Sequence, residues 1–213
     1  MKKFSQEKYE ELANAITHGI GALLSLVGSW FLIEKALLVQ NQRLLLSFII
    51  YGGGIFFLFV ASTLYHSFSH EALKKRLQVI DHVGIYLMIA GTYTPFAMVT
   101  LDRWWGNLLL WLVWTIAIAG IIFKIFFTGK FKILSTLIYL GMGWLVVIAA
   151  KPMYEAIPFN GILLIVAGGL LFSAGTIFYL WERLCFNHAI WHLFVLGGGI
   201  CHFFAIFFYS YPH

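Results

Sequence analysis

Leu44–Tyr65, which reads LLLSFIIYGGGIFFLFVASTLY, decides the fold because it contains no Asp, Glu, Lys or Arg along its whole length. A helix that spans a bilayer needs about 20 predominantly apolar residues, and this run is long enough. Backbone groups in lipid must be hydrogen-bonded within their own segment, and the run lacks the alternation of a barrel strand. The stretch therefore predicts a transmembrane α-helix.

Six further apolar runs are bounded by polar or charged residues in the same way: Ala15–Val39, Val79–Leu101, Trp105–Phe127, Ile133–Ala150, Gly161–Trp181 and Ala189–Tyr209. The 213-residue chain is 61% hydrophobic and 11% charged, whereas a soluble domain is about 25% charged. We predict an all-α integral membrane protein, a seven-transmembrane-helix bundle that forms a single domain over residues 1–213. A short cytoplasmic segment of about residues 1–14 is expected before the first span. The seven spans and their short connections leave no room for a separate soluble domain, so function is expected inside the bundle.

The Lys and Arg residues predict the orientation of the bundle, because cytoplasmic connections carry an excess of them. Ten of the 14 lie in the N-terminal segment and in the connections after the second, fourth and sixth spans, and four lie on the other side. The N-terminus is therefore expected in the cytoplasm and the C-terminus outside. These cations occur in ones to threes without a basic stripe, which argues against nucleic-acid binding despite the net charge of +5.

Polar side chains gather at the expected cytoplasmic ends of four spans. They are Asn14 and His18 on the first span, Ser62 and His66 on the second, Asp81 and His82 on the third, and His188 and His192 on the seventh. Residues four apart share one face of a helix. Ionisable groups in apolar spans are costly, and by default they mark a functional or a paired structural site.

Three of these histidines have the pattern of a metal site. Two histidines four residues apart can bind one ion, and a third from a neighbouring helix leaves a catalytic zinc one open position for water. His66, His188 and His192 fit this pattern. Asp81 is then expected to act as general base on the water, and Ser62 to donate a hydrogen bond to the developing oxyanion. The ligand types favour Zn²⁺, although iron also accepts imidazole and carboxylate.

A simpler interpretation is that the imidazoles only hydrogen-bond a backbone carbonyl or another helix, since such pairs also occur by chance. The convergence of His66 and Asp81 in one leaflet favours the metal site. His82 is rotated by about 100° from Asp81, so it is expected to pack or to lie beside the ligands. Asn14 and His18 are expected beside the ligands too, with His18 alternatively facing the substrate. His202 lies about 15 Å along the helix from His192 and is excluded.

The motifs Asn14-x3-His18, Ser62-x3-His66, Asp81-His82 with Ala90–Pro95, and His188-x3-His192 occur in this order. Together they resemble the hemolysin III family, the bacterial branch of the progestin and adiponectin receptor group, more distantly related to alkaline ceramidases. The resemblance covers nearly the whole chain. It implies a bacterial plasma membrane protein, cytoplasmic at its N-terminus. It also implies a zinc site in which His66, His188 and His192 are ligands, with Asp81 and Ser62 around the bound water.

The leading functional hypothesis is a zinc-dependent hydrolase that cleaves an amide or ester in a membrane lipid at the cytoplasmic leaflet. A second hypothesis is a non-enzymatic membrane sensor or receptor-like protein, acting in membrane homeostasis, in which zinc only clamps helices. A cytolytic pore is suggested by the family name alone. It is disfavoured because the spans show no ring of charges or polar stripe that would line a water-filled channel.

Overall fold

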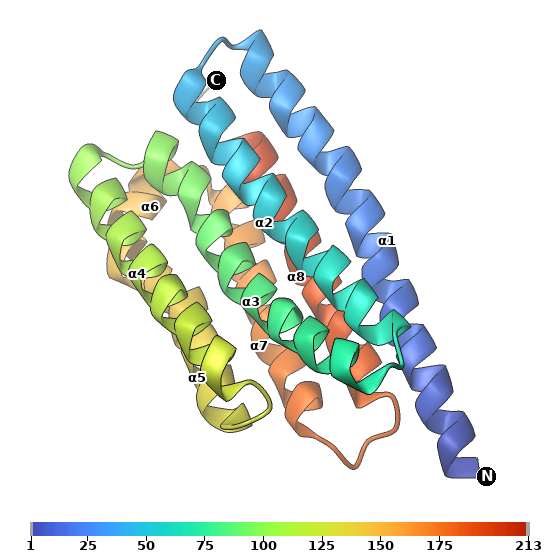
Figure 1. The fold of residues 1–213 in the computed structure, drawn as a ribbon. Coiled ribbons are helices and arrows are strands. Elements are labelled where there is room, and N and C mark those ends of the chain that lie inside the picture. The colour runs from blue at the N-terminus through green and yellow to red at the C-terminus, as the bar shows by residue number, and fades with distance from the viewer. Residues whose placement is uncertain (1, 212–213) are drawn as a thin grey trace.

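The computed structural model describes residues 2–211, and side chains from residue 6 onward. Figure 1 shows this part of the chain as a bundle of long helices without strands. The helices are α1 (Lys2–Leu38), α2 (Gln42–Ser67), α3 (Glu71–Pro95) with η1 (Phe96–Thr100), α4 (Arg103–Phe127), α5 (Lys132–Gly143) with η2 (Trp144–Ala149) and α6 (Ala150–Ala156), α7 (Phe159–Leu180) and α8 (Asn187–Tyr209). Seven of these units are long and apolar enough to cross a membrane, which confirms the predicted seven-span bundle.

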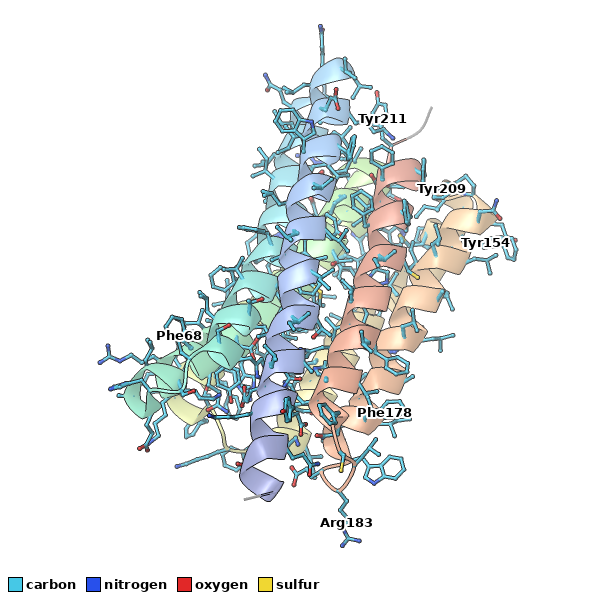
Figure 2. The ribbon with its side chains drawn as sticks, turned by 90° about the vertical axis from the view of Figure 1, so that its right-hand side faces the viewer. Phe68, Tyr154, Phe178, Arg183, Tyr209 and Tyr211 are labelled. Carbon is cyan, nitrogen blue, oxygen red and sulfur yellow. The ribbon has the colours of Figure 1, made fainter. Side chains whose placement is uncertain are left out.

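The arrangement places the two termini at opposite ends of the bundle (Figure 1). Helix α2 packs between α1 and α3, and α8 packs against both α7 and α1. Large apolar side chains remain on the outer surface, among them Trp30 at 71% and Trp111 at 76% exposure. In Figure 2, Tyr154, Tyr209 and Tyr211 lie near one end of the bundle, and Phe178 lies near the other. An apolar outside with aromatic residues toward both ends fits a bilayer.

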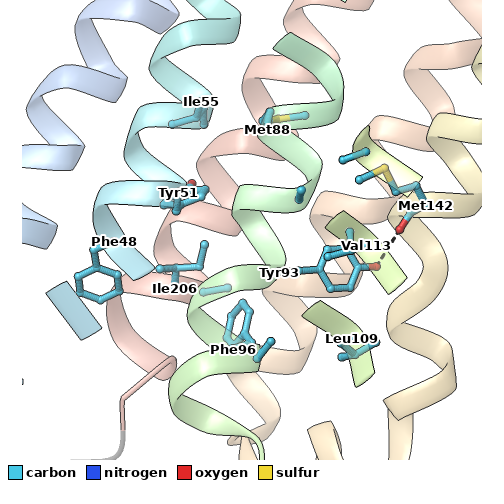
Figure 3. Packing of buried hydrophobic residues seen from close by; sticks show 14 of the residues in the cluster. Phe48, Tyr51, Ile55, Met88, Tyr93, Phe96, Leu109, Val113, Met142 and Ile206 are labelled. Carbon is cyan, nitrogen blue, oxygen red and sulfur yellow. Dashed lines mark hydrogen bonds between the residues drawn. The ribbon is translucent and has the colours of Figure 1, made fainter. Parts of the chain in front are cut away.

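Small residues allow α2 and α3 to approach each other closely. A Cβ on Gly54 would lie 2.8 Å from the carbonyl oxygen of Leu87, and one on Gly84 would lie 2.9 Å from the Cα of Leu58. Close backbone approach is how helices in lipid gain packing energy. Figure 3 shows Tyr51 and Ile55 of α2 in the buried core that this contact helps to form.

The fifth span differs from the predicted continuous run Ile133–Ala150. It is broken into α5, the 3₁₀ segment η2 and the short helix α6. The hydroxyl of Tyr93 supports the break: it donates to the carbonyl oxygen of Gly143 at 2.6 Å and accepts from the backbone N–H of Val146 at 2.9 Å. Figure 3 also shows its contact with the carbonyl oxygen of Met142, at 3.1 Å. A side chain from α3 thus satisfies backbone groups that a regular helix would have paired internally.

The first helix begins earlier in the chain than the first predicted apolar span. Helix α1 is continuous from Lys2 to Leu38, so residues before Ala15 already belong to it. A helix rises 1.5 Å per residue, and this extension carries further polar side chains alongside the ends of α2 and α8. Some of these side chains lie beside the histidine cluster described next.

Candidate metal centre

Three histidines meet where the last turn of α2 lies beside the first two turns of α8. His66 is the second-last residue of α2, and His188 and His192 follow the start of α8 at Asn187. One ring nitrogen from each residue lies within 4.8 Å of the others. The ring centroids are 5.0 Å apart for His66 and His188, 5.1 Å for His66 and His192, and 4.6 Å for His188 and His192. The structure therefore brings together all three residues that the sequence proposes as ligands.

The hydrogen bonds of two of these rings leave one nitrogen of each for an ion. His192 Nδ1 lies 3.2 Å from the backbone carbonyl oxygen of Asn14 and donates to it. His66 Nδ1 lies 2.7 Å from a carboxylate oxygen of Glu11, and His66 Nε2 is buried without a hydrogen-bond partner among the described residues. Metal-binding histidines usually donate their other N–H to a carboxylate or a backbone carbonyl. His66 and His192 have this pattern of hydrogen bonds, so their remaining ring nitrogens fit a metal ion.

Asn14 and His18 of α1 lie directly beside the cluster. The side-chain amide nitrogen of Asn14 is 3.4 Å from His66 Nδ1. The ring of His18 stacks on that of His192, with centroids 3.5 Å apart and planes 9° from parallel. Neither nitrogen of His18 has a partner among the described residues. His18 therefore contacts a ligand residue through its ring face, outside the three-histidine group.

Asp81 and Ser62 form the third side of the site. Both are buried, at 7% and 0% exposure, and Asp81 is close enough to interact with both Ser62 and His66. The hydroxyl of Ser62 approaches Asp81 without reaching regular hydrogen-bond geometry. Asp81 is among the residues that line the cavity described below, and Ser62 is not. The carboxylate is therefore the member of this pair that a ligand in the cavity would meet.

Sequence reasoning missed Glu11. Its carboxylate bridges two groups: one oxygen contacts His66 Nδ1 at 2.7 Å, and the other contacts Lys74 Nζ, at the start of α3, at 2.9 Å. A usable signal was present, because Glu11, Asn14 and His18 are spaced three and four residues apart and so share one face of a helix. The expectation that the first 14 residues precede the span hid this pattern.

The cluster opens into a cavity of about 110 Å³ inside the bundle. His188, His192 and Asp81 line it where it meets the histidine cluster, and apolar side chains such as Met88 and Val195 line it farther along α3 and α8. His202 lines it farther along α8 and donates from Nε2 to the carbonyl oxygen of Ile165 at 3.1 Å. As its spacing predicts, His202 is not in the histidine cluster. An apolar passage that ends in polar groups suits an amphiphilic ligand.

Comparisons with known proteins match the chain along almost its whole length. The family described as haemolysin-III related matches residues 6–203, a range that includes every candidate site residue. Hemolysin-3 of Bacillus cereus is 50% identical over 212 residues, which cover 100% of this chain and 97% of that protein. The hemolysin-3 homolog of Bacillus subtilis (strain 168) is 50% identical over 200 residues, 94% of each chain.

A more distant relative comes from a different kingdom. The human monocyte to macrophage differentiation factor is 29% identical over 211 residues, which cover 95% of this chain and 85% of that protein. The match therefore extends over nearly the whole of this chain. With seven apolar helices and a family match along almost its entire length, this chain is a multi-pass bacterial membrane protein that belongs to the haemolysin-III-related family.

Proposed function

We propose that this protein is a zinc-dependent intramembrane hydrolase that cleaves an amide or ester bond in a membrane lipid at the cytoplasmic leaflet. The observation that carries the proposal is the meeting of three imidazoles and one buried carboxylate at the end of an apolar cavity. His66, His188 and His192 would hold the ion, and three imidazole ligands leave zinc the open position of a catalytic site. A bound zinc would supply Lewis acidity toward a carbonyl and an activated water.

The chain's own residues supply the remaining functions. Asp81 would accept the proton of the attacking water and later return it to the leaving group. Ser62, which does not line the cavity, would donate its hydroxyl hydrogen to the Asp81 carboxylate beside it and so orient that carboxylate. The apolar middle of the cavity would bind the acyl chain and exclude bulk water from the reacting carbonyl.

The experiment combines metal analysis with a substrate panel. Purified wild-type protein should contain about one zinc per chain and should hydrolyse at least one member of a panel of lipid amides and esters. Asp81→Ala should keep its metal and its fold and lose turnover, whereas His188→Ala should lose both metal and turnover. Metal-loaded wild-type protein that cleaves nothing in a broad panel would count against the hydrolase.

A second candidate is a non-enzymatic sensor in which the metal clamps helices. It is favoured by the bonds from α1 to His66 and His192, which would let one ion fix α1, α2 and α8 together. Asp81→Ala distinguishes the two candidates, because a clamp needs no general base. If this variant retained every cellular function of the wild type, the sensor would replace the hydrolase. A pore remains the third candidate and predicts ion flux through liposomes that contain the protein.

A further inference from the structure

A second polar cluster lies between α3, α4 and α5, on the side of α3 that faces away from α2. One close contact shows how α3 and α4 are aligned: Gly120 of α4 packs against the ring of Tyr86 of α3. The two helices are antiparallel (Figure 1), so one turn toward the metal end places His82 opposite Lys124. Tyr139 of α5 completes the cluster, because its ring lies 4.7 Å from that of Tyr86.

Lys124 is the unusual member of this cluster. The sequence suggests that it snorkels from the end of α4 to the interface, but its side chain is buried, at 3% exposure. No hydrogen bond or ion pair of its ammonium group occurs among the described residues. His82 is the ionisable neighbour that feels its charge. A buried charge in a membrane protein is normally paired or functional.

Another lysine at the same end of the bundle provides a contrast. Lys132 is ion-paired with Glu182 at 2.8 Å and lies over the ring of Tyr179 at 4.4 Å. Its hydrogen bond lowers the pKa of the Glu182 carboxyl, which is exposed in the connection between α7 and α8. Lys132 thus has its counter-ion within the chain, whereas Lys124 has none among the residues that the structure describes.

The other members of the cluster carry polar atoms without hydrogen-bond partners among the residues described. His82 Nδ1 and the hydroxyls of Tyr86 and Tyr139 are buried without a hydrogen-bond partner in the described part of the chain. The two hydroxyls approach each other but do not reach regular hydrogen-bond geometry. Unsatisfied buried polar atoms each cost free energy, and three of them lie together beside the side chain of Lys124. This arrangement favours a ligand that accepts hydrogen bonds.

We propose that Lys124, His82, Tyr86 and Tyr139 form a binding site for the anionic head group, a carboxylate or phosphate, of an amphiphile whose alkyl chain lies in the cavity. His82 and Tyr139 line that cavity, which connects the site to its apolar middle. The anion would pair with the Lys124 ammonium and accept hydrogen bonds from the three neutral donors. Asp81, also at the cavity wall, faces Ser62 and His66 on the α2 side of α3.

The test measures binding of tritiated oleate to the purified full-length protein in a neutral maltoside detergent, with and without bound metal. Unlabelled oleate and oleoyl lysophosphatidate should compete better than neutral monooleoylglycerol. Lys124→Met should weaken both anionic competitors at least about tenfold, the size expected for a lost charged hydrogen bond, and should leave monooleoylglycerol unchanged. Lys130→Met, which removes an exposed lysine from the neighbouring connection, should change nothing.

Two tyrosine variants and one more competitor test the proposal independently of Lys124→Met. Tyr139→Phe and Tyr86→Phe remove hydroxyls without changing packing, and each should weaken oleate binding even if Lys124→Met does not fold. Competition by inorganic phosphate alone would assign the site to free anions as well as to lipid head groups. A wild-type protein that binds monooleoylglycerol as well as oleate, or a Lys124→Met protein that keeps the preference for anions, would overturn the proposal. The same binding result is expected without metal. A failure of the hydrolase proposal would therefore not change the outcome expected here.

Discussion

Two of the candidate ligand histidines use their ring nitrogens for two different tasks. In His66 and His192, Nδ1 bonds to a group on α1, either the Glu11 carboxylate or the Asn14 carbonyl. These bonds fix the orientation of each ring and leave Nε2 for an ion. Orientation is therefore set by α1, which contributes no ligand to the cluster itself.

Replacement of Glu11 should loosen the metal. Glu11→Gln keeps the size of the side chain but removes the charge that bonds to His66, so we expect zinc affinity to fall about 10- to 100-fold. The measurement is the zinc content after competition with a chelator, by mass spectrometry of the metal. Glu7→Gln, one turn earlier and exposed, is the matched control. Equal zinc retention in the two variants would show that Glu11 does not position the ligand.

Individual helices follow the hydropathy pattern closely, except where a tertiary contact supports an irregular backbone. The third span leaves regular α-helical geometry directly after Pro95, where η1 forms a π-helical turn. The proline itself predicts such a disturbance. The break in the fifth span has no equally plain signal in its own sequence, because the hydroxyl that supports it belongs to Tyr93 of α3.

Tyr93→Phe should destabilise the bundle through this break. Removal of the hydroxyl leaves the carbonyl of Gly143 and the N–H of Val146 without a partner, at a cost of about 1–3 kcal/mol in the free energy of unfolding. Tyr51→Phe is the control, since the buried hydroxyl of Tyr51 makes no hydrogen bond among the described residues. Unfolding in mixed micelles should show a loss for the first variant and none for the second.

The glycine triplet of α2 offers a second test at the level of helix packing. Gly54→Ala places a Cβ against the backbone of α3 and should cost about 1–3 kcal/mol of unfolding free energy. Gly53→Ala meets no atom within 4 Å and should be neutral or stabilising by up to about 1 kcal/mol. Equal effects of the two substitutions, measured in the same micelles, would contradict the close approach of α2 and α3.

The whole molecule brings the ends of α1, α2 and α8 to one site. A bound metal should therefore stabilise the bundle, by about 2.7 kcal/mol at a free concentration 100 times its Kd. Removing the metal with a chelator should lower the Tm of the wild type in a thermal unfolding assay. His188→Ala should abolish this shift, and His70→Ala, at an exposed position, should preserve it. An unchanged wild-type Tm on chelation would argue against a metal that joins the helices.

The orientation of the whole bundle in the membrane is a prediction from the distribution of Lys and Arg. Cys185 is a free, exposed thiol in the connection between α7 and α8, which is predicted to be cytoplasmic. A membrane-impermeant thiol reagent should modify it only after the cells are permeabilised. In a Cys185→Ser background, Lys151→Cys at the opposite end should react in intact cells. The reverse labelling pattern would invert the topology.

The sequence by itself determined the number of spans. Burying charge in lipid is costly, so each spanning run of about 20 residues must itself be nearly free of charged residues. It also determined which histidines could share an ion, because spacing along a helix fixes the face on which a side chain lies. Only the tertiary structure decided the role of Glu11, the support that Tyr93 gives to a broken helix and the burial of Lys124. These features depend on contacts between helices far apart in the sequence, and the depth and rotation of one helix against another are set by packing that no single run encodes.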